Sequence, residues 1–199
     1  KEVKLSTIEE ALTTLTTAEF NDALKRNRSA FLFRGLPNVS YKLTTSLRWN
    51  CKGKAGELEP SILRNFSKYA ASTSPLNSCW EQMVIGQHHG LPTRLMDWTY
   101  SPLAALHFAT SGEDITGMNQ HDAVVWAIDI TEMNTLLPAK YQKVLNDERA
   151  YLFTIDMLDR VAKDLTTYDN DMGEDGIVLL EPPSIDQRII NQYSYFSII

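Results

Sequence analysis

The stretch Gln87-His88-His89-Gly90-Leu91-Pro92-Thr93-Arg94-Leu95-Met96-Asp97-Trp98-Thr99 is a polar run between two strongly apolar segments. It gathers two histidines, an arginine, an aspartate and a tryptophan within thirteen residues. Loops and strand ends that a rigid scaffold positions carry most binding groups in proteins. The stretch therefore predicts either a functional site or a set of turns whose polar groups satisfy one another.

The residues around this stretch predict a helix, a strand and a second helix. The first helix is expected from about Leu76 to His88, with Gly90 as its C-terminal cap. Leu95–Thr99 is typical of a short strand. Ser101-Pro102 supplies an N-cap followed by a proline at the first helical position. The segment Leu103–Ala109 then predicts a buried helix, because nearly all of its residues are apolar.

Further apolar runs predict the other strands. Ala30–Phe33 precedes Arg34-Gly35 and predicts a buried strand that ends in a turn. Val124–Ile130 is apolar on both faces, which favours a central strand. Ile177–Leu180 and Arg188–Ile199 predict two more. Together with the helices, these strands predict an α+β fold with small central mixed or antiparallel sheets and flanking helices.

Capping boxes and apolar spacing predict five further helices. They are Ser6–Glu9 and Thr16–Glu19 with the residues that follow each, Glu57–Ala70, Leu136–Leu152 and Asp156–Leu165. Loops are expected up to Asn50, at Lys52–Gly56 and at the acidic run Asp169–Asp175. The domain organisation predicted from these elements is an N-terminal helical segment, 1–29, and one globular domain, 30–199.

The composition limits the function. The net charge of -6 and the pI near 5.2 argue against broad nucleic-acid binding. A local basic groove stays compatible with these values, and its candidate residues are Arg34, Arg48, Lys52, Lys54 and Arg94. Two cysteines make no disulfide framework, which favours the reducing cytoplasm. No apolar run approaches the roughly 18 residues of a membrane span. Because the chain lacks an initiator methionine and ends in an apolar run, we expect it to be trimmed or processed.

Several familiar kinds of active site are not indicated. His88-His89 together with Cys51 or Cys79 match no zinc spacing. The acidic run Asp169–Asp175 does not have the glutamate that a calcium loop carries at its twelfth position. Neither the serine-hydrolase elbow GxSxG nor the phosphate-binding patterns GxxxxGK[ST] and GxGxxG occur. We therefore expect no metal site and no hydrolase of these classes.

Two arginines remain as candidates for binding an anion. Arg34 ends a buried strand, where a guanidinium is costly unless it is paired or holds an anion. Arg94 and Asp97 have two interpretations that the sequence leaves open. They pair with each other and brace a turn, or they belong to a site for a ribose-phosphate ligand together with a hydroxyl and a later carboxylate.

Three ordered blocks of the chain resemble the FRG domain family. Phe33-Arg34-Gly35 matches the signature that names the family, and Gln87–Thr99 resembles its central motif. Ser101–Ala109 matches the helix that follows the central motif. Glu181-Pro182-Pro183, Arg188-Ile189 and Gln192 resemble the closing motif. The chain departs from the family at Ser194, where a glycine is usual.

The FRG domain is in turn similar to the ADP-ribosyltransferase fold, and this second resemblance implies a site for NAD. By position, it implies catalytic roles for Arg34 on the first strand, Thr99 on the second, and Glu181 or Gln192 as the third element. It also implies contacts with the nucleotide, and the residues expected to make them are Arg34, His89, Arg94, Asp97, Thr99 and Arg188.

The resemblance implies an NAD-dependent enzyme that transfers ADP-ribose to a protein or nucleic-acid acceptor, as a toxin or antiphage effector. Cleavage of the nicotinamide–ribose bond passes through an oxocarbenium-like state, which an adjacent carboxylate stabilises. Gln192 in place of Glu181 at that position would favour weak transfer, glycohydrolysis or simple binding. The alternative function is a non-catalytic nucleotide-binding or interaction module. A nuclease has the least support, because no carboxylate cluster for a metal is evident.

Overall fold

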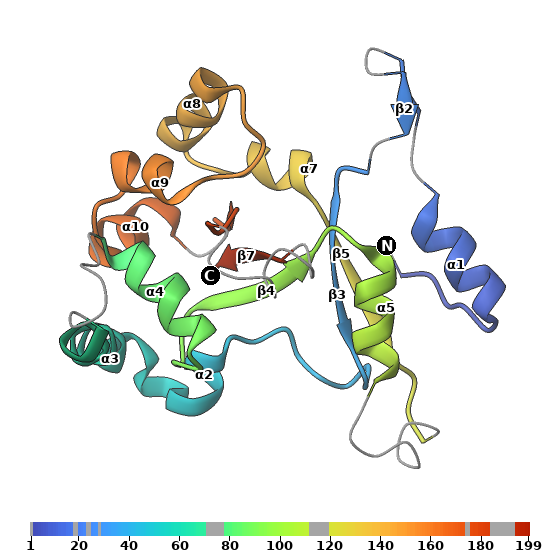
Figure 1. Cartoon of the computed structure of the whole chain (residues 1–199), viewed down its shortest axis with the longest axis horizontal. Helices are drawn as coiled ribbons and strands as arrows, with labels where there is room; N and C mark the ends of the chain where they lie inside the picture. Colours follow the sequence, from blue (N-terminus) through green and yellow to red (C-terminus); the bar gives the residue numbers. More distant parts are fainter. Residues whose placement is uncertain are drawn as a thin grey trace. The chain divides into compact units, whose positions relative to one another are not determined.

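A computed structural model describes residues 2–17, 20–22, 25–27, 29–70, 78–111, 120–173, 176–183 and 194–199 (Figure 1). The chain divides into two compact units. The first unit comprises Lys1–Tyr41 and Thr99–Asp129, and the second comprises Lys42–Trp98 and Ile130–Ile199. This division differs from the predicted one at residue 30, which stays a prediction.

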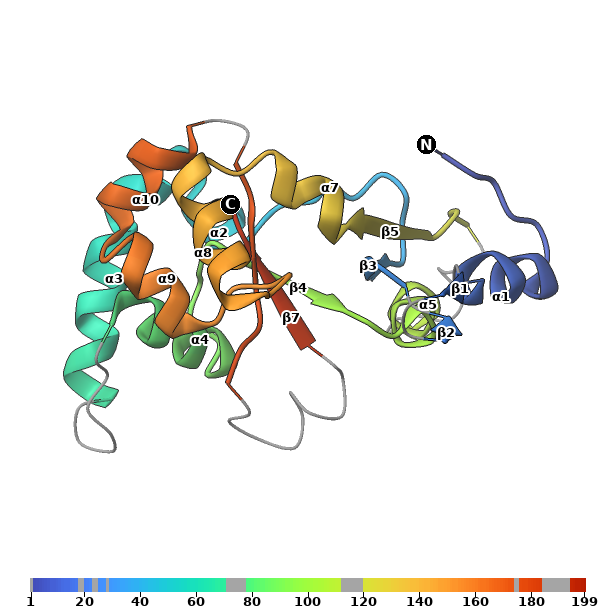
Figure 2. The same ribbon diagram turned by 90° about the horizontal axis from the view of Figure 1, so that it is seen from above.

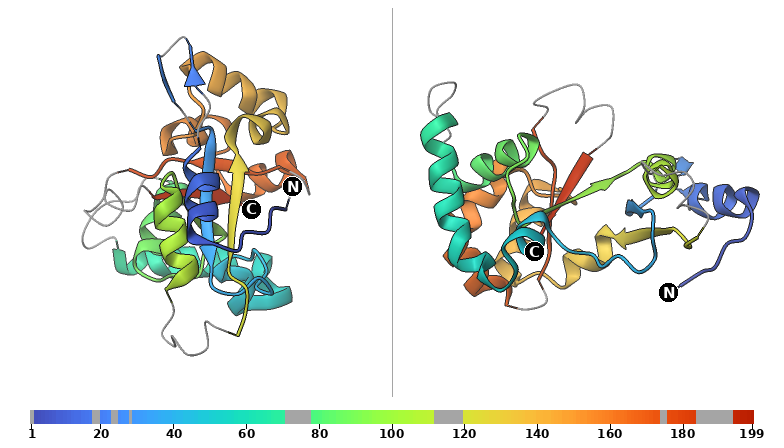
Figure 3. Two further views of the ribbon diagram at one scale, coloured as in Figure 1. Left: turned by 90° about the vertical axis from the view of Figure 1, so that its right-hand side faces the viewer. Right: turned by 90° about the horizontal axis from the view of Figure 1, so that it is seen from below.

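The first unit is built on two long strands and a helix. Strand β3 (Phe31–Leu36) pairs antiparallel with β5 (Val124–Asp129) along its whole length, from Phe31 opposite Asp129 to Leu36 opposite Val124. The left panel of Figure 3 shows these strands side by side, in blue and yellow. Helix α5 (Pro102–Thr110) packs along β3 (Figure 1). The predicted strand at Ala30–Phe33 is therefore confirmed, but it continues through Arg34 and Gly35.

The N-terminal part of this unit corrects one predicted helix. Helix α1 (Ile8–Thr16) begins with a capping box formed by Thr7 and Glu10, one residue later than predicted. The helix predicted after Thr16–Glu19 is wrong. Strand β1 (Phe20–Asn21) pairs there with β2 (Arg26–Asn27), so the backbone hydrogen bonds go across a short hairpin.

The second unit is mostly helical. Its helices are α2 (Ser46–Cys51), the 3-10 turn η1 (Lys52–Lys54), α3 (Ala55–Ala70), α4 (Cys79–His88), α7 (Ile130–Thr135), α8 (Ala139–Glu148), α9 (Ile155–Val161) and α10 (Leu165–Met172). Its strands are β4 (Leu95–Thr99, up to Trp98), β6 (Val178–Leu180) and β7 (Ser194–Ile198). Helices α8, α9 and α10 lie together in Figures 1 and 2. The largest buried side chains of this unit include Trp80, Tyr141, Phe153 and Tyr168.

Two predicted loops of this unit are helices. The segment before Asn50 contains α2, because the Thr45 side chain caps its first turn by accepting a hydrogen bond from the Arg48 amide at 3.3 Å. Asp169–Met172 of the acidic run form the end of α10, which begins at an Asp164 cap; Glu174 and Asp175 lie outside the described residues. Lys52–Gly56, predicted as a connector, holds η1 and the first residues of α3.

The strand order is β5-β3-β4-β7-β6, and the boundary between the two units falls within β4. The pairs β3–β5, β3–β4 and β6–β7 are antiparallel. The predicted α+β class is confirmed in this form, as one five-stranded sheet with helices. The prediction of a central strand at Val124–Ile130 is wrong, because β5 is an edge strand and the Trp126 side chain is 40% exposed. Within the described ranges, no helix has the length and apolar character to cross a membrane.

Candidate functional site

The glycine of the Phe33-Arg34-Gly35 signature is required by the packing of α5. A Cβ atom at Gly35 would overlap the carbonyl oxygen of Ala105 and lie 2.7 Å from the nitrogen of Ala109. Both contacts are with the helix backbone, which cannot rotate away as a side chain can. Gly35 thus lets α5 approach β3 closely, and only Ala105 and Ala109 of this helix are buried. The prediction of a helix buried on all sides is wrong, since Leu103 is 50% and Phe108 46% exposed.

The register of the sheet separates Arg34 from Thr99. Thr99 lies opposite Phe33, so the two side chains leave the sheet on the same face. This is the face of Gly35 and α5, because side chains alternate along a strand. Arg34 therefore points to the other face. The prediction that Arg34 and Thr99 line one cleft is contradicted by this register.

Each of these two residues has distinct surroundings. Thr99 is 5% exposed, and its hydroxyl accepts a hydrogen bond from the Ser101 amide at 3.0 Å, which shapes the start of α5. Arg34 is partly buried, and its partner across the strand pair is Trp126. Directly opposed residues on one face have Cβ atoms about 4.5–5.5 Å apart. Arg34 and Trp126 are thus cross-strand neighbours whose side chains leave the sheet on the face away from α5.

In the second unit, the Gln87–Thr99 stretch begins with a well-formed helix end. Gly90 has a φ of 82°, and its amide bonds to the Gln87 carbonyl at 3.0 Å while the Leu91 amide bonds to Gly86 at 2.8 Å. This pattern is the Schellman motif, which confirms the predicted cap. The next residue, Leu91, packs against Gly86, where a Cβ would meet the Leu91 side chain at 2.7 Å.

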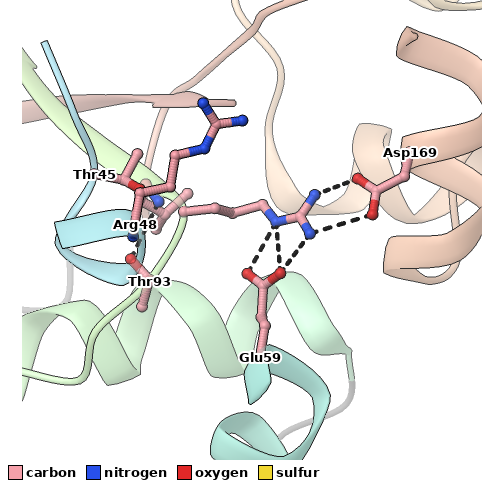
Figure 4. Close-up of polar contacts among 7 residues, drawn as sticks. Thr45, Arg48, Glu59, Thr93 and Asp169 are labelled. Carbon is pink, nitrogen blue, oxygen red and sulfur yellow. Dashed lines mark hydrogen bonds and ion pairs between the residues drawn. The ribbon is translucent and has the colours of Figure 1, made fainter. Parts of the chain in front are cut away.

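Arg94 holds two carboxylates from distant helices (Figure 4). Its Nε donates to Glu59 of α3 at 2.9 and 3.0 Å, and one terminal nitrogen donates to the same carboxylate. Both terminal nitrogens also donate to Asp169 of α10. Figure 4 shows Glu59 and Asp169 on two sides of one guanidinium. The interpretation in which Arg94 braces its turn through Asp97 is replaced by this cluster.

The charges of the Arg94 cluster compensate one another in a largely buried site. The Glu59 side chain is 2% exposed and the Arg94 side chain 10%, whereas Asp169 is 54% exposed. Burial alone lowers the pKa of Arg94. The hydrogen bonds and charges of Glu59 and Asp169 outweigh that effect and hold the pKa above its ordinary value. Arg94 therefore stays charged and ties α3 and α10 to the start of β4.

The neighbouring polar groups also bind one another. The Thr93 hydroxyl donates to the Gln87 side chain and accepts from the Leu95 amide at 3.1 Å. The Gln87 amide donates to the Asp97 carboxylate at 3.2 Å. On the other side, the Thr93 backbone exchanges hydrogen bonds with the Ser46 hydroxyl at 3.1 and 3.3 Å. Much of the polarity of the Gln87–Thr99 stretch is thus used to join α4, β4 and α2.

The remaining predicted site residues are exposed or lie outside the described ranges. His89 is exposed, with its ring centroid 6.5 Å from that of Phe66. Asp97 is exposed on β4, and Glu181 is exposed just after β6. Arg188 and Gln192 lie outside the residues that the structure describes, so their predicted roles are not tested. Across the described part of the chain, no group of three or more His, Cys, Asp or Glu side chains is placed to hold a metal ion.

Sequence reasoning missed three residues around these arginines. Glu59 shares a helix face with Ile62 and Phe66 by spacing, but the sequence does not indicate which cation it meets, and Asp169 was assigned to a loop. Trp126 was assigned to a buried strand on the basis of its apolar neighbours. The sequence around Trp126 does not indicate that its side chain is exposed, because this depends on the position of the strand in the sheet.

Comparison with known proteins gives one finding. Residues 29–116 match the FRG domain. The match supports the family resemblance over less than half of the chain. No curated protein and no solved structure matches the chain. The FRG match includes Arg34, the Gly35–α5 contact and the Arg94–Glu59 pair, whereas Trp126 and Glu181 follow it.

Proposed function

We propose that this chain binds NAD through Arg34 and Trp126 and transfers the ADP-ribose group to a macromolecular acceptor. The observation that carries the proposal is the pairing of Arg34 with Trp126 on the face of β3 and β5 away from α5. A guanidinium matches phosphate oxygens with two parallel hydrogen bonds. An indole that is 40% exposed offers a flat face to the nicotinamide or adenine ring. A dinucleotide carries both kinds of group.

The transfer is a substitution at the anomeric carbon of the nicotinamide ribose. The C1′–N bond breaks, and nicotinamide leaves as a neutral ring that keeps the bonding electron pair. An oxygen or nitrogen of the acceptor forms the new bond to C1′, and its proton passes to a base. The base is a carboxylate that also stabilises the oxocarbenium-like state, and the family resemblance implies Glu181 for this role, with Gln192 as the alternative third element. Such chemistry suits a toxin or antiphage effector.

A second function, nucleotide binding without turnover, is favoured by one observation. The register sends Thr99 to the face of α5, so Arg34 acts without the hydroxyl that the predicted site supplies. Binding by Arg34 and Trp126 does not need Thr99, whereas the predicted catalytic arrangement does. The two functions differ only in whether nicotinamide is released.

The experiment measures binding and turnover separately. NAD is titrated while tryptophan fluorescence is recorded, and labelled NAD is then followed for nicotinamide release and for label transfer to protein and RNA. Arg34→Ala and Trp126→Ala should each weaken NAD binding about 10- to 100-fold, the range of a lost charge-assisted hydrogen bond or ring contact. Arg34→Lys keeps the charge and should lose less. The matched controls are Arg64→Ala and Tyr69→Ala, two exposed residues of the second unit.

The outcomes separate the two functions. Release of nicotinamide together with transfer of label to protein or RNA by the wild type, both lost in Arg34→Ala, supports the transferase, whereas release without label transfer rejects it in favour of glycohydrolysis. Saturable binding without release supports the binding module and rejects the transferase. Equal NAD affinity for the wild type and for Trp126→Ala, with both folded by circular dichroism, rejects the Arg34–Trp126 site itself.

A further inference from the structure

The positive charge of this acidic protein is concentrated in one segment. Eight of its 19 lysines and arginines lie between Asp22 and Glu57, and none of its 25 acidic residues lies there. The rest of the chain therefore carries the other 11 of the 19 basic residues and all 25 acidic residues. A charge asymmetry of this size within one chain indicates a surface for an anionic partner.

The second unit presents part of this segment on a short, firmly attached element. We define the α2 surface as Lys42, Arg48, Trp49, Lys52 and Lys54, all of which are exposed. Trp49 is 74% exposed, the most of the four tryptophans. No acidic residue occurs from Lys42 to Gly56, so this stretch of α2 and η1 is uniformly positive.

The attachment of α2 explains why these side chains face solvent. Leu47 is 2% exposed, and its amide bonds to the Thr93 carbonyl at 3.0 Å. The Ser46 hydroxyl also binds the Thr93 backbone, and the buried Thr45 caps the helix. Figure 4 shows the Arg48 guanidinium directed away from the Glu59 carboxylate. The N-cap Thr45 and Leu47 are therefore buried, whereas Arg48 and Trp49 are exposed.

We propose that the α2 surface binds single-stranded nucleic acid. Lysine and arginine bind backbone phosphates, and an exposed indole stacks on an unpaired base, which a duplex does not offer. An anionic lipid surface would match the charge. An exposed indole beside four cations favours a partner that alternates phosphates with flat bases. A second part of this proposal rests on the proposed function: the acceptor of ADP-ribose is a single-stranded RNA or DNA that α2 binds.

The first test is direct binding, which does not involve NAD. A fluorescein-labelled 12-nucleotide RNA of mixed sequence is titrated with the whole chain, and anisotropy is recorded at several salt concentrations. Four phosphate contacts at about -0.7 each predict a slope of about -3 in the logarithmic salt plot, or roughly 50-fold weaker binding from 50 to 200 mM salt. Trp49→Ala should weaken binding about 5- to 100-fold, the range of one lost stacking contact.

Matched variants separate the surface from net charge. The triple variant Arg48→Ala, Lys52→Ala and Lys54→Ala should lose most of the binding and of the salt slope. The control Lys68→Ala, Lys143→Ala and Lys163→Ala removes the same charge from exposed positions elsewhere and should bind nearly as the wild type does. Trp49→Phe should abolish most of the fluorescence quenching by RNA, whereas Trp126→Phe should leave it unchanged.

Each result decides the proposal. Equal affinity of the two triple variants, duplex binding as strong as single-strand binding, or binding to vesicles of anionic lipid without binding to the oligonucleotide would overturn it. Transfer of label from NAD to the RNA, with a raised KM for RNA and an unchanged kcat at saturating RNA in Trp49→Ala, supports the acceptor role. RNA binding without any nicotinamide release rejects the transferase and leaves the nucleic-acid surface intact.

Discussion

The Arg94 cluster gives the sharpest prediction about stability. Removing Glu59 leaves the Arg94 guanidinium buried without its main partner, since the Glu59 side chain is 2% and the Arg94 side chain 10% exposed. Breaking a buried pair in this way costs about 3–5 kcal/mol. Glu59→Ala should therefore lower the free energy of unfolding by about that amount, and the melting temperature by roughly 6–20 °C. Arg94→Ala should cost a similar amount.

The other carboxylate of the cluster serves as a matched comparison. Asp169 is much less buried than Glu59. Its side chain is 54% exposed, so water screens its charge. Asp169→Ala should cost only about 0–1 kcal/mol. The double variant Arg94→Met and Glu59→Met should recover much of the loss, because apolar side chains of similar size do not need charge partners.

Urea denaturation, followed by circular dichroism, measures all four variants. A double-mutant cycle between Arg94 and Glu59 should give a coupling free energy of at least about 2 kcal/mol. Equal costs for Glu59→Ala and Asp169→Ala would refute the reasoning, because the buried Glu59 should cost several times more to remove than the exposed Asp169. A double variant that is as unstable as the single ones would refute it as well.

Two further predictions concern the packing of α5 and an acidic helix end. Gly35→Ala forces a Cβ into the Ala105 carbonyl and should cost at least about 2–3 kcal/mol in thermal denaturation, unlike Gly53→Ala, whose site is open. The pKa of Asp159 is raised by burial and by Asp156 and Glu81, against a hydrogen bond from Ser78. Its stabilising contribution is full below its unfolded pKa near 4 and is lost as pH rises through the folded value. Asp159→Asn should therefore unfold at higher urea than the wild type at pH 7 and show no such gain at pH 3; a loss of stability at pH 7 would contradict this sign.

Local signals in the sequence predicted the elements around the Gln87–Thr99 stretch. Gly90 was sufficient to locate the end of α4, because only a residue that tolerates positive φ forms this cap. Ser101 and Pro102 located the start of α5 in the same way. These signals act over four or five residues, so one sequence contains all of the information.

Pairings between distant residues could not be predicted. The partners of Arg94 lie 35 and 75 residues away, and Asp97 was only three residues away. The face on which Arg34 lies depends on the register of β3 against β4, and a shift by one residue reverses it. Sequence pattern alone does not set that register. The edge position of β5, and with it the exposure of Trp126, also follows only from the strand order.

The cost of separating charges decides which arginine is the better candidate for the nucleotide. For Arg94 to bind a phosphate, it would have to release carboxylates that it already holds through its Nε and both terminal nitrogens. Leaving Glu59 buried and unpaired costs about 3–5 kcal/mol, whereas a charge-assisted hydrogen bond returns about 1.5–3 kcal/mol. The exchange is unfavourable, so the predicted nucleotide contact of Arg94 is disfavoured and its role is to hold β4 in place. Arg34 lies opposite Trp126 across the strand pair, and Arg34→Ala is therefore the variant in which loss of NAD binding should be sought first.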